Sequence, residues 1–174
     1  MMPNSNNDLT QTLPAFFPVV VLMQRQPSVI SQWSDYQWQA VGVMSIADGI
    51  MQSNEPQVVH RGGDVMQVLY SGFQIRLHVD ECESYYFNLV SPEPHCYVIA
   101  RVNEENVPVP FLVSMSFDEA HAYIETDEEV YAIDIPPELY RWTEAFVLQH
   151  YTPEKRKKRK RDDWKTNEDK GRRE

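Results

Sequence analysis

The hydrophobic positions of the chain fall into short runs that are rich in Val, Ile, Tyr and Phe and are separated by Pro, Gly, Asn and Asp. Because β-branched and aromatic side chains pack well on a pleated surface, these runs predict β-strands rather than helices. The runs cover residues 16–26, 38–46, 58–61, 65–70, 73–80, 85–90, 96–102, 107–114 and 130–135. Gly42 indicates a β-bulge or a close backbone approach, and Pro108 and Pro110 place their run at a sheet edge.

Turn residues predict how some of these strands connect. Ser71-Gly72 separates the runs 65–70 and 73–80, so we expect a β-hairpin there, and Gly62 to Asp64 predicts a second turn. Apolar and polar side chains alternate after Gly72, as in a half-buried antiparallel strand. Continued alternation would bury two glutamates without partners, which is costly, so this strand has to break around residues 80–84.

Two segments carry helix signals instead. Ser116-Phe117-Asp118-Glu119 is a capping box, in which the serine hydroxyl accepts from the Glu119 backbone N–H and the glutamate side chain reaches back. It predicts a short helix over 117–125. One face of that helix carries Phe117, Ala120, His121 and Ile124. Pro136-Pro137 predicts the start of a longer helix that ends near His150. Its inward-facing residues are Leu139, Trp142, Ala145 and Phe146.

These elements define an α+β fold that is dominated by antiparallel sheet. We expect a curled sheet or a small barrel of about seven strands, with one short helix and a C-terminal helix over one opening. Residues 1–14 are predicted to form a flexible leader, residues 15–153 a single globular domain, and residues 154–174 a basic, disordered tail. The apolar run 15–23 is too short to cross a bilayer, and no cation precedes it as in a secretory signal. We therefore expect a cytoplasmic protein.

Charge adds a further division of the chain. Residues 1–154 contain five arginines, no lysine and 21 Asp and Glu residues, a formal net charge of −16, whereas residues 155–174 have a net charge of +6. The positive charge is concentrated in Lys155, Arg156, Lys157, Lys158, Arg159, Lys160 and Arg161. Because the acidic body repels phosphates, nucleic acid is not an expected partner of the body. The basic run fits a solvated extension, a docking peptide for an acidic partner or for the protein's own body, or a targeting or nucleic-acid contact.

The sequence predicts no catalytic residue, no metal site and no cofactor. Its six glycines form no phosphate-binding motif, and its five histidines are scattered singly. Cys82 and Cys96 lie in no CxxC pair, so we expect reduced thiols. His95 and Cys96 are adjacent on a predicted strand and therefore point to opposite faces, with the cysteine buried.

A small-molecule site remains as an alternative. An anionic ligand at the mouth of the curled sheet would need positive charge, which is scarce in the body. Candidates to line such a site are Arg76, His78 and Arg101.

The chain resembles a bacterial family of short uncharacterised proteins. The similar stretches are residues 18–25, 38–43, 86–89, 110–123 and 146–161, and the ending of helix, histidine, proline and basic run is the most specific of them. Genes of this family lie near those of molybdenum-dependent formate dehydrogenase, and its members are often labelled molybdopterin-guanine dinucleotide biosynthesis proteins. The resemblance, which covers about residues 16–161, implies a bacterial cytoplasmic accessory role around formate oxidation and supplies no catalytic residues.

The leading functional prediction is a non-enzymatic accessory protein that assembles, matures or regulates a molybdenum formate dehydrogenase. Its partner would be that enzyme or one of its maturation factors, and its two recognition surfaces the acidic body and the basic tail. A binder of a small molecule or of a molybdopterin-type cofactor is the alternative, and nucleic-acid contact through the tail is a third hypothesis.

Overall fold

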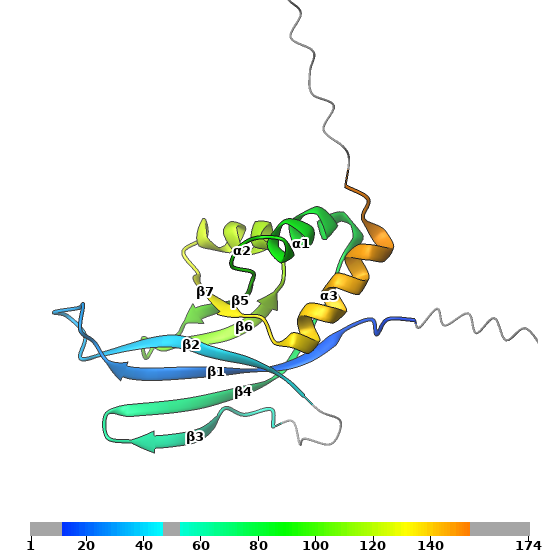
Figure 1. Ribbon diagram of the computed structural model, residues 1–174. Coiled ribbons are helices and arrows are strands. Elements are labelled where there is room, and N and C mark those ends of the chain that lie inside the picture. Colours follow the sequence, from blue (N-terminus) through cyan, green and yellow to red (C-terminus); the bar gives the residue numbers. More distant parts are fainter. Residues whose placement is uncertain (1–11, 47–52, 154–174) are drawn as a thin grey trace, which may run out of the picture.

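The computed structural model describes residues 12–46 and 53–153 (Figure 1). In this part of the chain, seven strands and three α-helices follow one another, with a short 3-10 helix η1 (Val79–Glu81) before the first α-helix. The strands are β1 (Phe17–Pro27), β2 (Tyr36–Ser45), β3 (Gln57–Gly62), β4 (Val65–Ile75), β5 (His95–Val102), β6 (Pro108–Ser114) and β7 (Glu129–Asp134). The α-helices are α1 (Cys82–Leu89), α2 (Phe117–Ile124) and α3 (Pro137–His150).

The strands form two antiparallel sheets, with the orders β2-β1-β4-β3 and β6-β5-β7. The predicted α+β class with mainly antiparallel sheet is therefore confirmed. The described strands are divided between two sheets rather than joined in one curled sheet or small barrel, and α1 is a helix beyond the two that were expected. As predicted from its prolines, β6 lies at a sheet edge.

The three-stranded sheet is the middle layer of the molecule. Figure 1 shows it between the four-stranded sheet and the helices α1 and α2, with α3 at one end of the sheets. Cys96 and Val98 of β5 belong to the core shared with β1, whereas Tyr97 packs its ring against Phe117 of α2. Because both faces of β5 are covered, the strand reads as a nearly continuous apolar run.

The predicted hairpin at Ser71-Gly72 is wrong. β4 runs through these two residues without reversing, and they stand opposite the single residue Val20 of β1. This is a β-bulge, in which Gly72 has the positive φ of 93° that glycine adopts without strain. The strand ends at Ile75, earlier than predicted. The reversal lies at the other predicted turn, where Gly63 has a φ of 58° between β3 and β4. A β-bulge at Val41, beside Gly42, confirms the prediction that Gly42 marks a bulge or a close backbone approach.

The predicted strand over residues 85–90 is also wrong, because residues 85–89 belong to α1 and Val90 caps its end. Cys82, Tyr85 and Leu89 are spaced as on one face of a helix, and all three are buried in the core. Burial of this face therefore outweighs the strand preference of the aromatic residues.

The two predicted helices are confirmed, with one correction at the start of α2. Ser116 Oγ accepts from the Glu119 backbone N–H at 3.1 Å, but the Glu119 carboxylate accepts from Ser114 Oγ instead of reaching back to the Ser116 N–H. On α2 only Ala120 is buried, and Phe117 and Ile124 are more than half exposed. On α3, Leu139 and Trp142 are buried as predicted, and Ala145 and Phe146 are half-buried.

Both cysteines are buried free thiols, which confirms the expectation of reduced side chains. Burial raises the pKa of Cys96 to about 12, and burial followed by the charge of Asp80 raises the pKa of Cys82. Since the thiolate is the reactive form, both thiols are poor nucleophiles at neutral pH. Among the described residues, no helix combines the length and apolarity needed to cross a membrane.

Candidate functional site: an acidic pocket between two helices

The structure separates the residues that were predicted to bind an anionic ligand. Arg76 and His78 follow β4 of the four-stranded sheet, whereas Arg101 lies on β5 of the other sheet. All three side chains are exposed, and none lines either of the two cavities described below. The basic run 155–161 lies outside the described residues.

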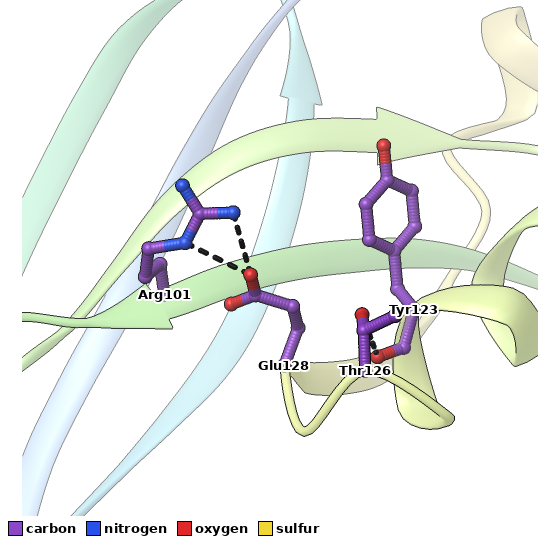
Figure 2. Close-up of polar contacts among 4 residues, drawn as sticks. All are labelled: Arg101, Tyr123, Thr126 and Glu128. Carbon is purple, nitrogen blue, oxygen red and sulfur yellow. Dashed lines mark hydrogen bonds and ion pairs between the residues drawn. The ribbon is translucent and has the colours of Figure 1, made fainter.

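Arg101 is engaged within the protein. Its Nε donates to Glu128 Oε1 at 2.8 Å, and its Nη2 donates to the same oxygen (Figure 2). The guanidinium also lies 5.0 Å from the ring centroid of Phe111. The hydrogen bond and the charge of Glu128 raise the pKa of Arg101. Thr126 Oγ1 donates to the Tyr123 carbonyl at 2.9 Å and so fixes the turn that carries Glu128. An anionic ligand at Arg101 would have to compete with this carboxylate.

Arg76 and His78 have different surroundings. The Arg76 guanidinium lies 5.9 Å from the ring centroid of Phe16, and the backbone N–H of His78 donates to the Tyr85 hydroxyl at 3.2 Å. Within the part of the chain that the structure describes, no ion pair joins either side chain to another residue.

A pocket of about 450 Å³ lies between α1 and α2, and we call it the acidic pocket. Its lining residues are Glu83, Ser84, Phe87, Asn88, Ser91, Tyr97, Phe117 and Asp118. They come from α1 and the turn after it, from β5 and from the start of α2. Phe87 and Phe117 are 57% and 52% exposed, so two large apolar rings stand open to solvent at this pocket.

Buried hydroxyl groups fix the two helices that form the walls. Ser116 Oγ donates to Glu81 Oε2 at 2.6 Å and lies 3.1 Å from Ser84 Oγ, which accepts from the Asp118 backbone N–H at 3.3 Å. Ser84 and Ser116 are buried. Because each bond joins residues on different elements, the network holds the start of α2 against α1.

Asn88 fixes the other end of α1. Its Nδ2 donates to the carbonyls of His95 at 2.7 Å and Met115 at 2.9 Å, and its Oδ1 accepts from the His95 N–H at 3.1 Å. One buried amide thus joins α1 to β5 and to the residue that follows β6. The pocket floor is therefore polar but already hydrogen-bonded within the protein.

The rim of the acidic pocket is suited to a cationic side chain. Glu83 and Asp118 are exposed carboxylates, and neither has an ion-pair partner within the described residues. None of the described arginines and histidines lines the pocket. A lysine or arginine could lay its apolar stem along the phenylalanine rings and place its charge between the carboxylates. Burial raises the pKa of Tyr97, so its phenol stays neutral in this pocket at ordinary pH.

Reading the sequence did not identify this pocket. Phe117 and Asp118 are neighbours in the predicted helix, but the sequence did not show that Phe117 is exposed. Glu83 and Phe87 join them only because residues 82–89 form a helix. The available signal was the spacing of Cys82, Tyr85 and Leu89.

The two sheets and the pocket above them define the class: an α+β protein of antiparallel sheets with an acidic, aromatic pocket between two short helices. The model of one protein family, described as "Protein of unknown function (DUF3305)", matches residues 18–161. The chain belongs to this family. A search of curated proteins and a search of solved structures each gave no match.

Proposed function

We propose that the protein is a non-enzymatic accessory protein whose acidic pocket binds a basic segment of a partner protein. The observation that carries the proposal is one cavity in which two exposed phenylalanine rings lie beside Glu83 and Asp118, two carboxylates without an ion-pair partner among the described residues. Exposed aromatic residues supply contact area, and charge complementarity selects the partner and speeds encounter.

The charge of the body supports a basic partner. The formal net charge of −16 over residues 1–154 leaves few cations to neutralise the carboxylates. Of those cations, Arg101 is paired with Glu128, and Arg141 lies 4.0 Å from Glu138. Binding should therefore weaken as ionic strength rises.

The resemblance to proteins encoded near formate dehydrogenase genes suggests the identity of the partner. We propose a subunit of a molybdenum formate dehydrogenase or one of its maturation factors, met in the cytoplasm. The basic run 155–161 would serve as a second recognition surface, for an acidic region of the same partner or, in its absence, for the acidic pocket itself.

Reversing charge at the rim is expected to weaken binding of the dehydrogenase subunits by at least about tenfold, because each exposed ion pair contributes up to about 1 kcal/mol and the new lysines also repel the partner. The variant is Glu83→Lys/Asp118→Lys, measured by isothermal titration calorimetry at low and physiological salt. Glu55→Lys/Glu104→Lys is the matched control, since it changes net charge equally at exposed positions outside the pocket. If both variants weaken binding equally, the loss of affinity would come from net charge alone, and the acidic pocket would not be the binding site.

Deleting residues 155–174 tests the second surface separately. We expect weaker association with the dehydrogenase subunits and a smaller dependence on salt, because fewer charges take part. The measurement is the same titration, together with formate oxidation by the assembled enzyme. Unchanged binding and unchanged enzyme activity would reject the role of the tail and leave the acidic pocket untouched.

A further inference from the structure

A second cavity, of about 470 Å³, opens between the two sheets, at the end where the chain leaves β1 and enters β2. We call it the inter-sheet cavity. Its charged and aromatic lining residues are Arg25, Tyr36, Trp38, Glu105, Glu129 and Tyr131. Its volume lies in the range usual for small-molecule sites, and it shares no lining residue with the acidic pocket.

Arg25 occupies a position that the strand pattern reserves for the core. Side chains alternate along β1, and Val19, Val21 and Met23 are fully buried on the inward face. Arg25 is the next residue on that face, directly opposite Trp38 of β2. A cation at an inward strand position is costly unless a partner compensates it.

No such partner is present among the described residues. The Nε of Arg25 is buried without a hydrogen-bond acceptor, and the guanidinium makes only a cation–π contact, 4.3 Å from the ring centroid of Tyr36. A buried donor left unsatisfied lowers stability, and such groups are rare in folded proteins. Although Glu105 and Glu129 line the same cavity, neither forms an ion pair with Arg25. The cavity therefore holds one positive and two negative groups that remain apart.

The walls add three aromatic rings. Tyr36 and Trp38 come from β2, and Tyr131 comes from β7 of the other sheet. Burial, and to a lesser extent the charge of Glu129, raises the pKa of Tyr131 to about 12. Its hydroxyl therefore stays protonated at neutral pH and can donate or accept a hydrogen bond.

We propose that the inter-sheet cavity binds a small zwitterionic aromatic compound of the aromatic amino acid class. Its anionic group accepts from Arg25, its ammonium group faces Glu105 and Glu129, and its ring lies among the three aromatic side chains. A simple anion would be repelled by the two carboxylates and a simple cation by the guanidinium, whereas a ligand with both charges is attracted at each end. This site is independent of the proposed partner binding.

Three probes separate the contributions of these groups in titrations of the full-length chain. L-phenylalanine carries the ring and both charges, 3-phenylpropionate lacks the ammonium group, and phenethylamine lacks the carboxylate. We expect L-phenylalanine to bind at least about tenfold more tightly than either analogue, since one charged hydrogen bond contributes about 1.5–3 kcal/mol. No binding of L-phenylalanine, or equal binding of an analogue, would overturn the proposal.

Variants assign the charges to residues. Arg25→Gln should weaken the binding of L-phenylalanine by at least about tenfold and should not weaken the binding of phenethylamine. Arg76→Gln makes an equal charge change outside the cavity and should alter the binding of neither probe. Glu105→Gln/Glu129→Gln should weaken the binding of L-phenylalanine and strengthen the binding of 3-phenylpropionate. This second test holds even if the Arg25 variant does not fold. The assignment of Arg25 to the anionic group and of the two glutamates to the ammonium group would be contradicted by either of two results. One is weaker binding of phenethylamine to Arg25→Gln, and the other is unchanged binding of L-phenylalanine to both variants. None of these outcomes bears on the acidic pocket.

Discussion

Asn88→Ala is expected to lower the free energy of unfolding by about 3–5 kcal/mol, because a buried backbone group left without a partner costs about 1–3 kcal/mol. The substitution removes three hydrogen bonds at once and leaves the N–H and carbonyl of His95 and the carbonyl of Met115 without the Asn88 amide. Asn88 is only 6% exposed, so water cannot easily replace that amide. Urea denaturation followed by circular dichroism measures the change.

Two further substitutions separate the hydrogen bonds from side-chain size. Gln74→Ala truncates an exposed amide on β4 and should change stability by less than about 0.5 kcal/mol. Asn88→Asp keeps the size and the acceptor for the His95 N–H, but its carboxylate would face two carbonyl oxygens, so we expect it to destabilise about as much as alanine. Tolerance of aspartate would show that the amide donor is not what matters.

The sequence predicted the strands best where tertiary structure agrees with local pattern. β1, β5, β6 and β7 lie within a residue or two of the predicted runs, since their β-branched residues are also the residues that the core needs. The capping box likewise located the start of α2, because that signal depends on neighbouring residues alone.

The errors arose where one local signal has two structural meanings. Ser71-Gly72 fits a turn, but a glycine with positive φ also serves a bulge, and only the pairing with Val20 decides between them. The segment 85–90 has strand-like composition, and its helical spacing becomes decisive only when Cys82, three residues before Tyr85, is included. Both choices depend on packing partners that are distant in the sequence.

The two candidate sites differ in how far the sequence could reveal them. Arg25 could have been found, because it continues the alternation of Val19, Val21 and Met23 and so places a cation on the core face of a predicted strand. The acidic pocket could not, since Glu83 and Asp118 meet only through the contact between α1 and α2. The scarcity of body cations directed the prediction to Arg101, which has an internal partner, and not to Arg25.

Trp142→Ala is expected to destabilise the protein by about 3–5 kcal/mol, the usual range for removing a buried tryptophan or phenylalanine ring. Trp142 is 7% exposed, its ring centroid lies 5.4 Å from that of Phe17 on β1, and its Nε1 donates to the Pro14 carbonyl at 3.1 Å. Through these contacts α3 is held against the four-stranded sheet and against the segment that precedes β1. Thermal unfolding followed by circular dichroism would register the loss as a fall in Tm.

Trp33 provides a matched control, because it is 97% exposed and Trp33→Ala should change stability by less than about 0.5 kcal/mol. Trp142→Phe keeps an aromatic ring beside Phe17 but removes the indole N–H, so a loss of stability well below that of alanine would show that ring packing dominates. If Trp142→Phe instead destabilises as much as Trp142→Ala, the hydrogen bond to Pro14 would be the main contribution. Stability equal to that of the Trp33 variant would mean that α3 is held against the sheet by other residues, of which the fully buried Leu139 is the first to test.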